Sequence, residues 1–159
     1  DIPFGFVAEL PNILSAFSAL YNVCLPELIK GDNKSSALAY SEELLTKVGL
    51  EHRISPKPSE LSGGERQIVT VARAIVSNPE SFQADEPTGN LDTKNGDKVS
   101  DLLFDLNKQL GTTLVLVTHD DRLAERCQRI VRLEGGKVVA DNASEAFQRE
   151  ALQDQAAEQ

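Results

Sequence analysis

Apolar residues recur along the chain in short runs that predict β-strands. Three runs, over residues 4–8, 81–85 and 112–118, each fit one strand. The run over residues 112–118 is β-branched and apolar at successive positions, which predicts a parallel strand buried on both faces. Two more runs, over residues 130–133 and 138–140, flank the turn sequence Glu134-Gly135-Gly136-Lys137. This arrangement predicts a β-hairpin.

Three segments between these runs carry apolar residues at helical spacing. The first ends at Gly49, which suits a left-handed C-terminal cap. The second begins after Ser62, a preferred N-cap residue, and ends at Asn78-Pro79; the third ends at Gly111. The three apolar faces consist of Leu38, Ser41, Leu44, Leu45 and Val48, of Ile68, Val69, Ala72, Ile75 and Val76, and of Val99, Leu102, Leu103, Leu106 and Leu110.

Breaker residues separate these segments. Residues 31–36 and 55–58 are predicted loops, and the apolar residues 22–29 are interrupted by Pro26. Residues from 142 onward are acidic and rich in Gln, and we expect one marginal helix there, capped by Ser144. Strands that alternate with helices predict an α/β fold.

Length and composition narrow the class of protein. The 159 residues, 40% of them apolar, suffice for one domain with a hydrophobic core. The net charge of −9 counts against nucleic acid as a partner, because such binding depends on basic residues. No apolar stretch is long enough to span a bilayer. Cys24 and Cys127 lack metal-ligand spacing, so we interpret them as reduced thiols of a cytosolic protein.

The sequence Leu61-Ser62-Gly63-Gly64-Glu65 has the residues of an anion-binding helix start. Glycines let the backbone approach an anion, and the free N–H groups and the dipole of the following helix favour negative charge. A helix capped by serine after a Gly-Gly turn explains the same residues. For this motif alone, both interpretations remain open.

Two further motifs follow predicted strands. Asp85 and Glu86 are adjacent carboxylates at a strand end, where one can bind Mg²⁺ and the next can polarise an attacking water. A solvated acidic turn is the alternative. His119 follows the strand over residues 112–118, and a lone histidine in such a place is more often structural than catalytic.

Taken together, in this order and spacing, these motifs resemble the ATP-binding-cassette (ABC) family over residues 4–140. Residues 84–92, 96–98 and 111–120 are most similar to ATPases of the lipoprotein-release and macrolide-export branch. The resemblance implies a P-loop NTPase-like ABC ATPase domain with a parallel-sheet core and a helical subdomain. Residues 12–77 would form the helical subdomain with the signature motif, and residues 78–141 the core with the Walker B, D-loop and His-switch motifs. Residues 142–159 would be an acidic tail.

The resemblance also implies a role for each motif. Asp85 would hold Mg²⁺, Glu86 would be the general base, and His119 would contact the γ-phosphate of ATP. Asp92, in the D-loop, would align the two sites of a dimer. Glu9 lies where the family has a glutamine that links the nucleotide and its Mg²⁺ to the membrane partner. The residues that would close over an ATP bound to the opposite subunit are Ser62, Gly63, Gly64 and Glu65.

The implied function is the ATP-hydrolysing subunit of an ABC-type export system. Such a subunit works as a homodimer with an integral-membrane permease, on the inner face of the cell membrane, and uses ATP and Mg²⁺. A non-hydrolysing or degenerate regulatory subunit is the second hypothesis. A soluble ABC ATPase of DNA repair or translation is the third, although it would need a coiled-coil insertion or a basic surface, and the sequence has neither. Lipoprotein, peptide and macrolide all remain open as the transported substrate.

Several residues depart from the family pattern. The sequence contains no Gly-x-x-x-x-Gly-Lys-Ser/Thr phosphate loop, which the family places upstream of Asp1. We therefore expect an N-terminally truncated domain that alone neither binds ATP tightly nor hydrolyses it. Glu9 replaces a glutamine, and Ile68 replaces a basic residue. Ser81 and Gln83 replace large apolar residues in a strand expected to be buried, where an unpaired amide costs roughly 1–3 kcal/mol.

Overall fold

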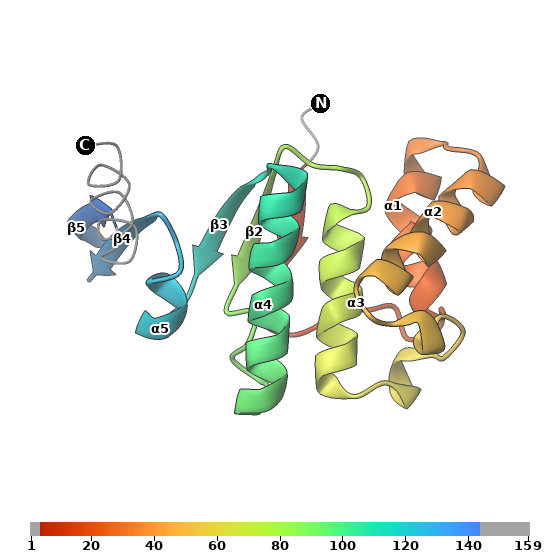
Figure 1. Cartoon of the computed structure of the whole chain (residues 1–159), viewed down its shortest axis with the longest axis horizontal. Helices are drawn as coiled ribbons and strands as arrows, with labels where there is room; N and C mark the ends of the chain where they lie inside the picture. Colours follow the sequence, from red (N-terminus) through yellow and green to blue (C-terminus); the bar gives the residue numbers. More distant parts are fainter. Residues whose placement is uncertain (1–3, 144–159) are drawn as a thin grey trace, which may run out of the picture. The chain divides into compact units, whose positions relative to one another are not determined.

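Three parallel strands form the sheet of the first part of the chain in the computed structural model, which describes residues 4–143 (Figure 1). They are β1 (Phe4–Val7), β2 (Ser81–Asp85) and β3 (Thr113–Val117), in the order β1-β2-β3. Phe6 pairs with Gln83, which pairs with Val115 on its other side. The three predicted strands are therefore confirmed.

Four helices accompany this sheet: α1 (Ala19–Lys30), α2 (Lys34–Lys47), α3 (Gly63–Ile75) and α4 (Thr93–Leu110). Two short 3-10 helices, η1 (Glu51–Arg53) and η2 (Pro58–Glu60), lie between α2 and α3. Figure 1 shows α3 and α4 side by side along the sheet, with α1 and α2 packed beyond α3. The helices predicted around residues 38–48, 63–76 and 99–110 are confirmed. Their apolar faces and the sheet share one core, which includes Val7, Leu45, Val69, Ile75, Phe82, Ala84, Val99 and Leu103.

The described residues fall into two compact units, residues 4–117 and residues 118–143. The second contains α5 (Asp121–Ala124), β4 (Arg129–Glu134) and β5 (Lys137–Ala143). β4 and β5 are antiparallel, which confirms the predicted hairpin, and an ion pair of 2.7 Å joins Arg129 Nη2 to Asp141 Oδ2 across it. The hairpin includes residues 142 and 143, so the expected helix does not begin there. The remainder of that helix, with Ser144, lies outside the described residues.

A close approach between β1 and α3 depends on Gly5. A Cβ atom at this position would lie 2.3 Å from the carbonyl oxygen of Ala74, far inside van der Waals contact. Because no side chain separates the strand from the helix, α3 is fixed against the sheet at this point. Ala74 lies in the last turn of α3, so this contact fixes the end of the helix opposite to the motif Ser62-Gly63-Gly64-Glu65.

The helix α1 was not predicted, because Pro26 interrupts its apolar run. Proline removes one helical N–H, yet α1 continues through it from its N-cap Ser18 to Gly31. Asn22, fully buried, anchors the start of the helix: its Oδ1 accepts from the Leu14 N–H at 2.7 Å, and its Nδ2 donates to the Leu14, Phe17 and Ser18 carbonyls. Ala19 and Val23 of the same helix are buried in the core, and this packing outweighs the local preference of proline.

The predicted loop over residues 31–36 is shorter than expected. Asn33 is the N-cap of α2, and its Oδ1 accepts hydrogen bonds from the backbone N–H groups of Ser35 (2.9 Å) and Ser36 (3.3 Å). Asparagine is a preferred N-cap residue, so this signal was present in the sequence.

The prediction that β3 is buried on both faces is wrong. Val115 and Val117 are 48% and 44% exposed, because within the described residues α3 and α4 cover one face of the sheet. Ser81 and Gln83 lie on the same uncovered face and are half-buried. The predicted cost of a fully buried amide in β2 therefore does not arise.

Candidate functional site

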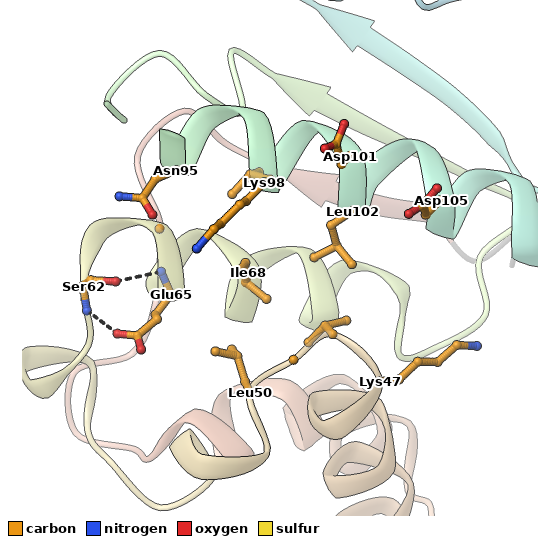
Figure 2. A pocket seen from close by; sticks show the side chains of 14 residues that line it. Lys47, Leu50, Ser62, Glu65, Ile68, Asn95, Lys98, Asp101, Leu102 and Asp105 are labelled. Carbon is orange, nitrogen blue, oxygen red and sulfur yellow. Dashed lines mark hydrogen bonds between the residues drawn. The ribbon is translucent and has the colours of Figure 1, made fainter. Parts of the chain in front are cut away.

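Ser62 and Glu65 cap the N-terminus of α3 reciprocally (Figure 2). The Glu65 N–H donates to Ser62 Oγ at 3.2 Å, and the Ser62 N–H donates to Glu65 Oε2 at 2.7 Å. The capped helix is thus confirmed as the local structure of this motif. Ser62 Oγ accepts in this cap, and the Ser62 side chain also stabilises the charged Glu65 carboxylate.

Glu65 carries a negative charge at this helix start. The hydrogen bond from the Ser62 N–H, helped by the Ser62 side chain and Arg53, lowers the pKa of the Glu65 carboxyl, although partial burial opposes the shift. Arg53 Nε lies 3.0 Å from Glu65 Oε1. An anionic glutamate complements the helix dipole and occupies two of the groups, the Ser62 N–H and Arg53, that would otherwise attract a phosphate.

Asp92 caps the neighbouring helix α4 in a similar way. Its Oδ1 accepts from the Asn95 N–H at 3.1 Å, and its Oδ2 accepts from Asn95 Nδ2 at 2.5 Å. The side-chain hydrogen bond from Asn95 is the main cause that lowers the pKa of Asp92. Asp92 therefore has a structural task at the start of α4, whatever it contributes across a dimer.

The adjacent carboxylates of Asp85 and Glu86 lie at the carboxyl end of β2, the edge at which open α/β sheets bind ligands. Glu86 has φ +43°, a left-handed conformation that costs a non-glycine residue roughly 1–3 kcal/mol. Its N–H donates to the Val117 carbonyl at 2.8 Å, which stabilises this turn. Backbone strain of this kind is typical of functional sites.

Glu9 lies beside the loop that follows these carboxylates. Its Oε1 accepts a hydrogen bond from Asn90 Nδ2 at 3.0 Å, across 81 residues of sequence. Ala8, the residue before Glu9, accepts at its carbonyl oxygen a hydrogen bond of 3.0 Å from Gln67 Nε2 in α3. Sequence reasoning missed Gln67 and Asn90. The available signal was an amide among the buried apolar positions of α3.

A groove of about 630 Å³ lies between the end of α2, α3 and α4. Figure 2 shows Leu50, Ile68 and Leu102 directed toward one another in the groove, with Lys98 extending from α4 toward the end where Ser62 and Glu65 lie. Ile68, the departure from the family's basic residue, thus lies in the apolar part of this groove, and Ser62 and Glu65 lie at one end.

The predicted site residues are divided between the two compact units. Glu9, Asp85, Glu86 and Asp92 belong to the first unit, with the capped start of α3. His119 belongs to the second unit, two residues beyond the end of β3, and is exposed.

Among the acidic residues of the site, Asp85 is one that could bind Mg²⁺. No group of three His, Cys, Asp or Glu side chains converges as a metal site among residues 4–143. Mg²⁺ at nucleotide sites needs only one or two carboxylates, with phosphates and water supplying the other ligands. Asp85, at the strand end, fits this requirement. In the described part of the chain, no helix has the length and apolar character to cross a membrane.

Comparison with known proteins supports the resemblance to the ABC family. Residues 4–89 match the family described as ABC transporter. The lipoprotein-releasing system ATP-binding protein LolD of Syntrophus aciditrophicus is 52% identical over 135 residues, 85% of this chain and 60% of the relative. The protein of the same name from Geobacter metallireducens is 51% identical over 137 residues, 86% of this chain and 61% of the relative. The chain thus spans about three fifths of the length of these relatives.

Solved structures agree. A dimeric ATP-binding cassette in a post-hydrolysis state with ADP and Pi superimposes with a TM-score of 0.78 at 37% identity, covering 89% of this chain and 63% of that one. A dimeric bacterial ABC transporter cassette gives 0.76 at 38% identity, covering 87% and 62%. The predicted family and fold class are confirmed: the chain belongs to the ABC transporter family of ATP-binding cassettes.

Proposed function

We propose that this chain is part of the ATP-hydrolysing subunit of an ABC export system. The observation that carries the proposal is the pair Asp85 and Glu86 at the carboxyl end of β2, with Glu86 in a strained turn bonded to Val117. Strain at a carboxylate that follows another carboxylate is difficult to explain as a solvated acidic turn, which would relax. The names of the relatives favour a lipoprotein as the transported substrate.

The proposed chemistry assigns one task to each residue. Glu86 accepts a proton from the water that attacks the γ-phosphate of ATP, and His119 contacts that phosphate. Asp85 and Glu9 hold Mg²⁺, which neutralises charge on the phosphates when bound. Glu9 must first leave Asn90, its partner in this structure.

A second subunit completes the site in this proposal. Ser62, Gly63 and Gly64 face an ATP held by the partner subunit, and the Ser62 hydroxyl turns from Glu65 to donate its hydrogen to a phosphate oxygen. Glu65 stays engaged with the Ser62 N–H, and Asp92 lies at the same interface. The solved relatives were determined as dimers, which favours this arrangement.

The membrane partner is an integral-membrane permease, which places the chain peripherally on the inner face of the cell membrane. The support is a run of exposed apolar side chains directly after Glu9, at Leu10, Leu14, Phe17 and Tyr21. Exposed apolar patches mark interaction sites. The helical subdomain, proposed for residues 12–77, carries most of this patch, and residues 78–141 belong to the nucleotide-binding core.

The 159 residues lack a phosphate loop, so we propose that the chain by itself does not retain ATP. Titration of a fluorescent ATP analogue with Mg²⁺ against the purified chain tests this point. We expect no saturation below the millimolar range, and micromolar binding would contradict the proposal.

The decisive test of hydrolysis is Glu86→Gln in the chain assembled with its permease and a phosphate-loop segment. We expect loss of phosphate release with nucleotide binding retained, because glutamine cannot accept the proton. Glu80→Gln, an exposed site before the same strand, is the control and should keep the wild-type rate. An unchanged rate in Glu86→Gln would reject the assigned base and favour the degenerate, regulatory alternative.

A further inference from the structure

Gln67 is a polar side chain buried in α3, with 1% of its surface exposed. Its Nε2 donates to the carbonyl oxygen of Ala8 at 3.0 Å, although 59 residues separate the two. A carbonyl oxygen only accepts, so the nitrogen of the amide must face it, which settles the orientation of the side chain. Gln67 therefore connects α3 to the segment that follows β1.

The stability of α3 does not explain this residue. Gln67 Oε1 is buried and has no hydrogen-bond partner among the described residues, a situation that costs roughly 1–3 kcal/mol. A methionine has similar length and would fill the same space without an unpaired oxygen. An amide at this position is thus costly for folding, and its one hydrogen bond is its distinguishing contact.

The segment that Gln67 contacts is also connected on its other side. Ala8 accepts from α3, and the next residue, Glu9, accepts at Oε1 from Asn90 Nδ2 at 3.0 Å. Asn90 lies four residues after Glu86, in the loop that leads from β2 to α4. Ala8 and Glu9 therefore link α3 to the loop that follows Asp85 and Glu86.

We propose that Gln67 is a positioning residue that couples α3 to Glu9 and, through Glu9, to the loop over residues 86–90. When Glu9 moves away from Asn90, the Ala8 carbonyl moves with it, and Gln67 transmits the displacement to the helix that begins after Ser62. The unpaired Oε1 is an acceptor that an N–H of the displaced segment can use. The consequence for hydrolysis rests on the proposed function, whereas the coupling itself does not.

The coupling can be measured without nucleotide, by ¹⁵N NMR of the side-chain amides in the 159-residue chain. Gln67→Met removes the bond to Ala8. We expect the Asn90 side-chain resonances to move toward their positions in Glu9→Ala, because Glu9, the partner of Asn90, directly follows Ala8. Thr70→Val is the control, because Thr70 is equally buried in α3 but bonds only within the helix, to Arg66. It should leave the Asn90 resonances in place.

The reverse experiment keeps the proposal testable even if Gln67→Met folds poorly. Energetic coupling is reciprocal, so Asn90→Ala on the exposed loop should shift the Gln67 side-chain resonances, whereas Lys94→Ala, also exposed, should not. Unchanged Asn90 resonances in folded Gln67→Met, or unchanged Gln67 resonances in Asn90→Ala, overturn the proposal. Failure of the Glu86→Gln test would leave this result unaffected.

Discussion

Gly64 in α3 and Asn95 in α4 approach so closely that a Cβ atom at position 64 would lie 3.1 Å from Asn95 Oδ1. Asn95 is itself bonded to Asp92, the N-cap of α4, and Ser62 caps α3. The first turns of the two helices are thus packed together through a glycine. The Gly-Gly pair of the motif therefore serves helix packing, in addition to any contact with an anion.

This contact predicts different outcomes at the two glycines of the motif. Alanine in a helix normally adds about 0.5–1 kcal/mol relative to glycine, and Gly63→Ala should show such a gain because its nearest neighbour, Leu91 Cδ2, is 3.5 Å away. Gly64→Ala must displace Asn95, and overpacking costs roughly 1–3 kcal/mol. We expect urea unfolding to give a lower free energy of unfolding for Gly64→Ala than for Gly63→Ala. Equal values for the two variants would show that the Asn95 side chain can move aside without cost.

Gly5→Ala tests the packing of α3 on the sheet. The added Cβ would lie 2.3 Å from the Ala74 carbonyl, which is backbone and cannot rotate away, so we expect a loss of at least about 1–3 kcal/mol. Gly96→Ala is the matched control, a buried glycine whose nearest neighbour, Thr88 Cβ, is 3.6 Å away. Thermal unfolding followed by circular dichroism compares the two. A wild-type midpoint for Gly5→Ala would disprove the close approach.

Ser41→Ala should stabilise the protein. The Ser41 hydroxyl is fully buried in α2 and has no partner among the described residues, so its removal relieves an unsatisfied group worth roughly 1–3 kcal/mol. Ser100→Ala is the contrast, because the buried Ser100 hydroxyl donates to the Gly96 carbonyl at 2.8 Å. Denaturant titration should show a gain in the free energy of unfolding for Ser41→Ala that exceeds any change for Ser100→Ala. A loss at position 41 would mean that the hydroxyl has a partner, such as water.

Glu65→Gln should have an effect that depends on pH. Hydrogen bonds from Ser62 lower the pKa of Glu65 below its ordinary value of 4.5 in the folded state. A carboxyl group whose pKa is lower in the folded state stabilises the protein at pH values above its unfolded-state pKa. This stabilisation is lost as the pH falls through the folded-state pKa. At neutral pH we expect the variant to lose up to about 1 kcal/mol, since solvent screens this partly exposed charge.

The difference between wild type and Glu65→Gln should therefore shrink below pH 4.5, which unfolding measured from pH 7 to pH 3 would reveal. Glu43→Gln, an exposed change in α2, should give a small difference with no such trend. A difference at position 65 that grew toward low pH would contradict the assigned direction of the shift.

Local signals were sufficient to predict the parts of the molecule whose structure depends on near neighbours. Ser62, Gly49 and Gly111 mark helix ends because caps act within one turn, and the apolar spacing of α3 and α4 already identifies their buried faces. The paired carboxylates at the end of β2 could be placed because a strand followed by a turn is also a local pattern.

The tertiary structure decided what depends on residues far apart in sequence. Helix α1 continues through Pro26 because Ala19 and Val23 pack into the common core, and β3 is exposed on one face because helices cover the other. Gln67 contacts Ala8, Glu9 contacts Asn90, and Glu86 adopts its left-handed turn beside Val117 through long-range hydrogen bonds. The sequence by itself thus determined the motifs, most of the elements and the family. Packing and hydrogen bonds between distant segments determined how the candidate site is assembled, because no local pattern encodes the partner of a long-range contact.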